Sequence, residues 1–234
     1  MDRKLLFLGS NSRKFSENFS TTWTSSNYAE STWYNNFYNN WDWYAWYTGG
    51  AGTAYPQING SELYAMAGQG GNPVFVNMHR TKENYNLNRN FKFKYSFTLT
   101  DDGSHPYGYS YISLSMCGNN ALTSYGDTYG LELLLASTTN GSNTFYIKNN
   151  NSTIATPYSN FSWMTKHYIY CEKRGNTIYI ATNDTGTWPG SYTYSYSLTN
   201  LTMQSSSLMC MLYSVGFQDY WVGGKIDDLY TFIY

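Results

Sequence analysis

Trp221-Val-Gly-Gly-Lys-Ile-Asp-Asp-Leu-Tyr-Thr-Phe-Ile-Tyr234 is the stretch of this sequence that decides the fold. Gly223-Gly224 predicts a turn, because glycine reaches φ > 0 without steric cost. The residues that follow predict a strand, with both faces substantially apolar, so we expect it between neighbouring strands or layers and not at a solvated edge. Alternation assigns Ile226, Asp228, Tyr230, Phe232 and Tyr234 to one face and Lys225, Asp227, Leu229, Thr231 and Ile233 to the other.

Other segments predict strands by the same alternation. The clearest is 91–99, where aromatic and aliphatic residues alternate with Lys, Ser and Thr, and the turn Asp101-Asp102-Gly103 ends it. Segments 166–174 and 177–181, separated by Gly175-Asn176, predict a hairpin. We expect further strands at 73–78, 107–116, 131–135, 144–148, 191–198 and 207–213, with a polar connector at 81–90. Short strands at intervals of about 8–12 residues predict an all-β, antiparallel β-sandwich.

Three segments also resemble a known family. They are Gln57-Ile-Asn-Gly-Ser-Glu-Leu, the hairpin around Gly175-Asn176, and the final Gly-Lys-Ile-Asp-Asp, in that order. Together they resemble LamG-like jelly rolls of the concanavalin A-like lectin/glucanase superfamily, over roughly Trp46 to Tyr234. The resemblance implies a jelly-roll β-sandwich domain at 46–234 and leaves residues 1–45 as a loop-rich N-terminal arm, which would be an attachment segment if the protein is a structural subunit. It implies a fold and names no ligand.

Composition restricts the partners that we expect. Charged residues make up 12% of the chain, about half the usual share. A net charge of −1 gives no reason to expect nucleic acid or an anionic membrane. No stretch approaches the roughly 20 apolar residues of a membrane span. The 26 tyrosines among many Asn, Ser, Thr and Gly residues suit a neutral polar partner such as a glycan or surface polysaccharide.

The sequence lacks the residue patterns of catalysis. In this superfamily, enzymes that cleave β-glucans carry Glu-x-Asp-x-x-Glu on one strand, which brings the acids into the cleft. No glutamate of this chain is followed by Asp two positions later, so we expect no enzyme and, in particular, no glycoside hydrolase. Asp227 and Asp228 are expected to hydrogen-bond a nearby loop or turn.

We expect no cofactor and no metal site. His79, His105 and His167 are isolated, and the cysteines lack the paired spacing of zinc ligands. Asp101-Asp102-Gly103 is interpreted as a turn, with calcium binding as the alternative. Cys117, Cys171 and Cys210 are interpreted as small buried hydrophobic residues, with one disulfide as the alternative.

Aromatic side chains are the candidate ligand contacts. A flat π face matches the C–H face of a pyranose, whereas alternate tryptophans can equally fill a core or a subunit interface. The first set lies in the aromatic run at 41–47, and the second lies on the polar face of segment 107–116 or in loops beside glycine or proline. The seven candidates are Trp41, Trp43, Trp46, Tyr109, Tyr111, Trp188 and Trp221.

The leading functional hypothesis is a non-catalytic recognition or adhesion module of lectin type that binds neutral glycans. The alternative is a structural or decorating subunit of a phage or virus particle, which contacts other virion subunits or itself as a homo-oligomer. The apolar run at 5–8 is too short for a signal peptide. The hydroxyl- and amide-rich composition also suits exposure outside a cell. Together, these two observations predict an extracellular or virion-associated protein without a recognisable signal peptide.

Overall fold

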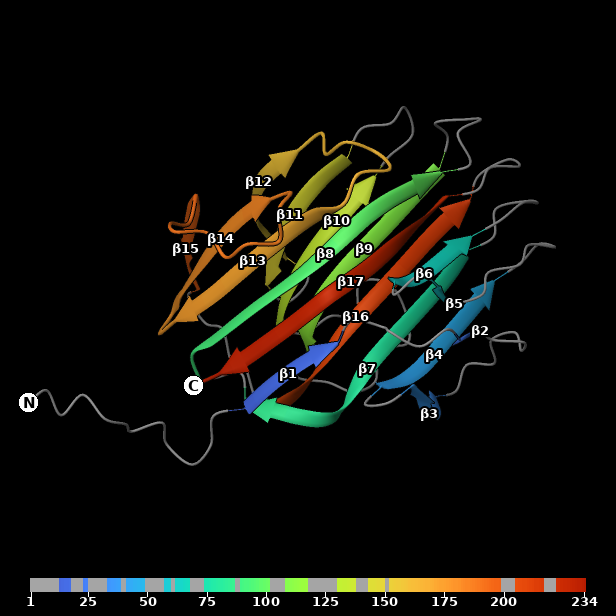
Figure 1. Cartoon of the computed structure of the whole chain (residues 1–234), viewed down its shortest axis with the longest axis horizontal. Helices are drawn as coiled ribbons and strands as arrows, with labels where there is room; N and C mark the ends of the chain where they lie inside the picture. The colour runs from blue at the N-terminus through green and yellow to red at the C-terminus, as the bar shows by residue number, and fades with distance from the viewer. Residues whose placement is uncertain are drawn as a thin grey trace, which may run out of the picture.

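The computed structural model is a sandwich of two antiparallel β-sheets (Figure 1). It describes the backbone of residues 13–17, 23–24, 33–38, 41–48, 57–59, 62–67, 74–86, 89–101, 108–117, 130–137, 143–149, 152–198, 205–216 and 222–234. Side chains are described at 62, 89–99, 131–136, 143–149, 152–198 and 224–234. The described residues contain strands and no helix, which confirms the predicted all-β, antiparallel β-sandwich. No helix suited to crossing a membrane occurs in this part of the chain.

Nine of the described strands form one sheet, which we call sheet A. Its order is β15-β14-β13-β8-β17-β6-β5-β2, with β1 paired to β17. The bounds are β1 (Arg13–Glu17), β2 (Trp23–Thr24), β5 (Gln57–Asn59), β6 (Glu62–Ala67), β8 (Phe91–Asp101), β13 (His167–Arg174), β14 (Thr177–Asn183), β15 (Tyr194–Ser197) and β17 (Val222–Ile233).

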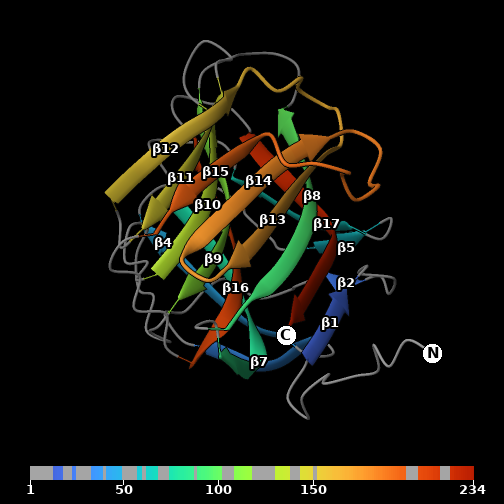
Figure 2. The ribbon, with the colours of Figure 1, turned by 90° about the vertical axis from the view of Figure 1, so that its left-hand side faces the viewer.

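The other eight described strands form sheet B, which lies behind sheet A in Figure 1 and to its left in Figure 2. Its order is β12-β11-β10-β9-β16-β7-β4-β3. The bounds are β3 (Trp33–Tyr38), β4 (Trp41–Thr48), β7 (Val74–Asn86), β9 (Gly108–Cys117), β10 (Gly130–Ser137), β11 (Asn143–Asn149), β12 (Ser152–Ser159) and β16 (Ser205–Gly216).

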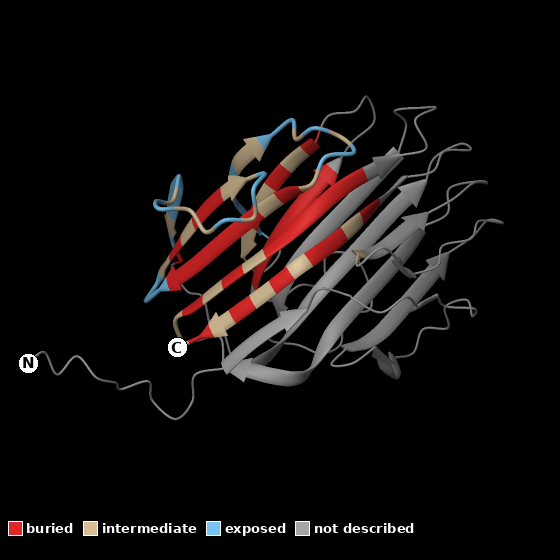
Figure 3. Cartoon of the chain, in the orientation of Figure 1, coloured by how far each residue is buried: buried red, intermediate tan, exposed pale blue. Residues whose placement is uncertain are grey.

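The core lies between the two sheets (Figure 3). From β8, alternate side chains enter it and are at most 1% exposed, as the alternation predicts: Phe91, Phe93, Tyr95, Phe97 and Leu99. Sheet B contributes Leu131, Leu133 and Leu135. Each such side chain is worth roughly 1.5–3 kcal/mol when it is withdrawn from water. Cys171 is a free, fully buried thiol in this core, which confirms its interpretation as a small hydrophobic residue.

Strand β17 occupies the middle of sheet A, as predicted. One edge pairs with β8, and the other pairs first with β6 and then with β1. The predicted turn at Gly223-Gly224 is wrong, because both glycines lie inside the strand and pair with β6 and β8. A turn there would remove ladder bonds on both edges of a central strand, so the tertiary pairing overrides the local glycine signal.

The predicted faces of β17 are also wrong beyond Asp227. The register with β8 shifts between Asp227 and Tyr230, and Asp228 has a φ of 50°. This β-bulge inserts one residue, so the core receives Ile226 and then Leu229, three positions apart. After the bulge, Tyr230 lies on the face of sheet A that points away from the core. We call this face the outer face.

Three further differences from the sequence expectations concern β7, β12 and the N-terminal residues. The connector predicted at 81–90 begins only after Asn86, because β7 continues to pair with β16 that far, across a register shift between Ser207 and Met209. Strand β12 was not predicted, since it is a largely exposed edge strand of Ser, Thr and Pro without apolar alternation. Residues 1–45 contain β1, β2 and β3, which pair into the two sheets, and the expected domain boundary after residue 45 falls inside β4.

Candidate functional site

Backbone register places two predicted ligand contacts on one row across sheet B. Trp46 pairs with Val76, Val76 with Tyr213, Tyr213 with Tyr111, and Tyr111 with Ala136. On β10 the position of Ala136 alternates with core leucines, so this row is not the core row. Three strand spacings separate Trp46 from Tyr111, which is about 14 Å. We call these positions the Trp46–Tyr111 row.

The other candidates of sheet B hold different register positions. Trp43 belongs to the row that ends at the core residue Leu133. Trp41 pairs with Thr81 on β7, and Tyr109 pairs with Val215 on β16. Trp221 lies outside the described residues. The register therefore separates Trp46 from Trp43, although both are on β4.

The β10 end of the Trp46–Tyr111 row is covered. Glu132, Leu134 and Ala136 alternate with the core leucines, yet they are only 1%, 2% and 4% exposed. The Glu132 carboxylate lies 3.6 Å from the Lys148 ammonium, so this buried charge has an ionic partner. A ligand on this face would accordingly lie over β9, β16, β7 and β4.

Trp188 lies on the other sheet. It is half-buried in the loop between β14 and β15, with its ring centroid 5.1 Å from that of Tyr170 and 6.0 Å from that of Tyr230. The side chain of Asn183 accepts hydrogen bonds from the backbone N–H of Thr185 and Gly186, in Asx-turn fashion. These contacts fold the loop onto the outer face of sheet A, away from the Trp46–Tyr111 row.

A group of lysines and carboxylates lies where the bulge of β17 meets the loop before β13. The Lys166 ammonium is 2.6 Å from Asp227 Oδ2, 3.8 Å from Asp228 Oδ2 and 3.9 Å from Glu62 Oε1. Tyr168 donates its hydroxyl hydrogen bond to Asp228 over 2.9 Å. Asp227 thus bonds a residue of a neighbouring loop, as the sequence predicts. The contact of Lys166 with these acids was not predicted, because Lys166 is distant from them in the sequence and only the fold brings them together.

The two partners of that ion pair respond differently to burial. Burial raises the pKa of Asp227, and the bond to Lys166 offsets only part of that rise. For Lys166, burial lowers the pKa, but the hydrogen bond to Asp227 and the attraction of the neighbouring acidic groups together outweigh burial, and the net shift is upward. The physical reason is depth, since the Asp227 side chain is 10% exposed and that of Lys166 is 34% exposed.

A second charged group surrounds Glu172 on the outer face of sheet A. Its carboxylate accepts hydrogen bonds from Arg174 Nη2 at 2.7 Å and the Tyr234 hydroxyl at 2.9 Å, and lies 3.3 Å from Lys92 Nζ. Burial alone would raise the pKa of Glu172, but the bonds from Arg174, Tyr192, Tyr234 and Lys92 lower it to about 2. A carboxyl group held ionised in this way is unsuited to act as a general acid.

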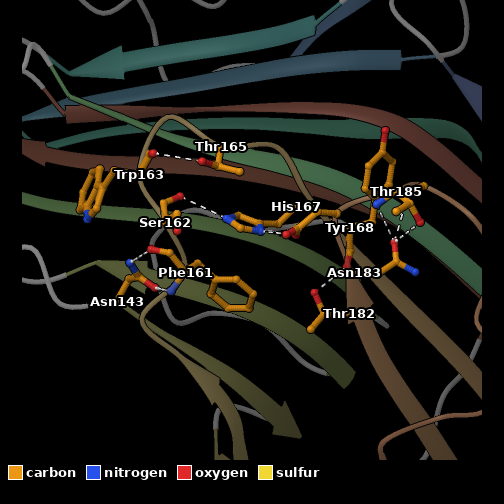
Figure 4. Close-up of polar contacts among 12 residues, drawn as sticks. Asn143, Phe161, Ser162, Trp163, Thr165, His167, Tyr168, Thr182, Asn183 and Thr185 are labelled. Atoms are coloured by element: carbon orange, nitrogen blue, oxygen red, sulfur yellow. Dashed lines mark hydrogen bonds and ion pairs between the residues drawn. The ribbon is translucent and has the colours of Figure 1, made fainter.

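His167 joins the loop before β13 to the loop between β14 and β15 (Figure 4). Its Nδ1 lies 2.6 Å from Asp184 Oδ1, and its Nε2 lies 3.1 Å from the Ser162 carbonyl. Asn143 fixes the loop before β13 through two bonds to the backbone of Phe161, at 2.6 and 2.7 Å. Within the described residues, no three His, Cys, Asp or Glu side chains are grouped to hold a metal ion.

No protein-family model matches the sequence, and no curated protein matches it. Solved structures do match. Peanut lectin bound to a nine-residue peptide has a TM-score of 0.55 at 11% identity, over 96% of this chain and 100% of that one. Lectin UEA-II complexed with galactose has a TM-score of 0.54 at 10% identity, over 80% and 91%. The PL7 alginate lyase AlyA1 from Zobellia galactanivorans has a TM-score of 0.52 at 10% identity, over 82% and 94%. At such identities the likeness shows a shared fold.

Proposed function

Since the chain has the concanavalin A-like jelly-roll fold, we propose that it is a non-catalytic, lectin-type module that binds glycans. Lectins among the structures of similar fold, one of them with galactose bound, support a glycan as the partner. The fold alone does not carry the proposal, because one fold hosts many functions. The observation that carries it is the Trp46–Tyr111 row, which aligns two of the predicted aromatic contacts across sheet B.

The proposed ligand of this row is a neutral glycan. Between Trp46 and Tyr111 the row has Val76 and Tyr213, without a formal charge. Aromatic faces stack on the C–H faces of sugar rings, and a span of about 14 Å suits a chain of several rings. The low charged fraction of the whole chain also favours a neutral partner.

Substitution in this row tests the function. We expect Trp46→Ala and Tyr111→Ala each to weaken binding on a multivalent glycan array by about 2- to 12-fold, the equivalent of ~0.5–1.5 kcal/mol for one lost ring contact. Multivalent display is needed because single sites of this kind are weak. Trp46→Phe keeps a ring and should retain most of the binding. Trp43→Phe, three residues earlier on the same strand and in the row that ends at Leu133, is the matched control.

Two results would count against this function. The first is an array on which the multivalent wild-type protein binds no glycan. The second is glycan binding that Trp46→Ala and Tyr111→Ala leave unchanged while circular dichroism shows both variants folded.

The alginate lyase of similar fold makes catalysis the second candidate. Against it stand the missing Glu-x-Asp-x-x-Glu pattern and the engagement of described carboxylates by lysine or arginine, as at Glu132 and Glu172. We expect neither reducing ends nor ultraviolet-absorbing unsaturated products when the protein is incubated with glucans or alginate. Turnover that disappears on substitution of one acid would establish an enzyme.

A structural role on a virion or other assembly is the alternative to recognition. Its support is the aromatic hairpin of β3 and β4, which lies at one edge of sheet B, where Tyr and Trp residues would suit a subunit interface. An extracellular or virion-associated location belongs to the same proposal. Light scattering tests it, since an assembly that Trp33→Ala dissociates would favour the structural role over recognition.

A further inference from the structure

On the outer face of sheet A, one buried carboxylate is surrounded by more positive charge than is needed to balance its own negative charge. Glu172 is 2% exposed and is bonded by Arg174, Lys92 and the phenols of Tyr192 and Tyr234. One cation would neutralise this carboxylate, and two phenols would complete its hydrogen bonds. The second cation therefore leaves the group with a net positive charge.

That charge is available at the surface. The Arg174 side chain is 53% exposed and that of Lys92 is 39% exposed, although each contacts Glu172. Glu172 thus holds both cations in place from below while their remaining surface faces solvent. An arginine fixed in this way is prepared to bind a second carboxylate, because its planar fork loses little freedom on binding.

Aromatic rings flank the two cations. The Arg174 guanidinium lies 5.0 Å above the Tyr179 ring and 5.9 Å from that of Tyr192. On the other side, Phe232 and Tyr234 stack with centroids 5.6 Å apart and planes at 18°. Register aligns Tyr179, Glu172, Lys92 and Phe232 in one row, so Tyr179 and Phe232 are about 14 Å apart.

We propose that Arg174 and Lys92, with the rings of Tyr179 and Phe232, form a second binding site that takes the carboxylated sugars of an acidic polysaccharide. The uronate carboxylate meets Arg174 and Lys92, and neighbouring sugar rings lie against the aromatic side chains. A nucleic acid fits less well, because its closely spaced phosphates need a longer cationic stripe than two side chains supply. The site is on the opposite sheet from the Trp46–Tyr111 row, so either proposal can fail without the other.

The test compares one polymer in two charge states. Calorimetric titration of the full chain with polygalacturonate should show binding that weakens as salt is added, and its fully methyl-esterified form should bind at least about tenfold more weakly. We expect Arg174→Gln to weaken polygalacturonate binding about tenfold, the loss of one charge-assisted contact. Lys225→Gln, at the far end of β17, removes the same charge and should leave binding unchanged.

A second variant, expected to keep or strengthen binding, distinguishes loss of the site from loss of folding. Glu172→Gln removes the buried negative charge but keeps a side-chain oxygen that can accept the Arg174 hydrogen bond, so Arg174 stays in place and the group gains net positive charge. This variant should bind polygalacturonate as tightly as the wild type or more tightly. Weaker binding by a folded Glu172→Gln variant, or equal binding of the esterified polymer, would overturn the site. Equally tight binding of polyglutamate or single-stranded DNA would overturn its assignment to sugars.

Discussion

The buried charge of Glu172 bears on stability and on the proposed polysaccharide site. Its carboxylate is buried on a strand face that otherwise carries aromatic and basic residues, and it remains ionised because Arg174, Lys92 and two phenols bond it. The same bonds fix Tyr234, whose backbone N–H also donates to the Asn90 carbonyl at 3.0 Å. A single buried charge thus ties β17 to β13 and β8.

The low pKa of Glu172 predicts a pH dependence of stability. With a pKa of about 2 in the folded protein and about 4.3 in an unfolded chain, the residue stabilises the native state fully above pH ~5. That contribution, on the order of 3 kcal/mol, is lost as the pH falls toward 2. We expect Glu172→Gln to flatten this part of the profile in urea unfolding measured from pH 7 to pH 2. Parallel profiles for variant and wild type would contradict the prediction.

At the scale of elements, the bulge in β17 sets which side chains reach the core. Asp228 sits at a φ of 50°, which Asn and Asp tolerate and β-branched residues resist. We expect Asp228→Val to lower the free energy of unfolding by roughly 1–3 kcal/mol, through this strain and the lost bond to Tyr168. Asp228→Asn keeps an acceptor at the same place and should cost less than about 1 kcal/mol. Chemical denaturation of the two variants checks this, and equal losses would exclude backbone strain as the cause.

Alternation predicted those elements whose two faces differ. Strand β8 was predictable because five core residues alternate with Lys, Ser and Thr. The bulge was not, since one inserted residue leaves the composition of β17 unchanged and becomes visible only in its register with β8. Strand β12 was not predictable either, because an exposed edge strand has no buried face to mark it.

The candidate sites were predictable in residue type but not in grouping. Sequence favours aromatic contacts, yet only register reveals that Trp46 and Tyr111 share a row and that Trp188 lies on the other sheet. The charged groups around Lys166 and Glu172 could not be predicted, because their members are distant in sequence and none forms a motif.

For the whole molecule, the pairing of β1 with β17 protects an edge. Residues 13–17 cover the backbone of β17 from Leu229 to Ile233. Removal of residues 1–17 would expose that row of N–H and C=O groups, and exposed edges pair with other chains. We expect this truncated protein to self-associate, which light scattering would detect as particles of more chains. Removal of residues 1–12, which keeps β1, should leave the oligomeric state unchanged. The prediction would be contradicted if the form lacking residues 1–17 had the same oligomeric state as the form lacking residues 1–12.

The central place of β17 also bears on how a cell makes this protein. A ribosome synthesises β8, β6 and β1 well before β17, the strand that all three pair with. Until β17 emerges, β8 has an open edge and its five large apolar side chains lack part of their cover. Translation at roughly 5–20 residues per second leaves this intermediate exposed for several seconds. Sheet A is therefore completed only after β17 has been synthesised.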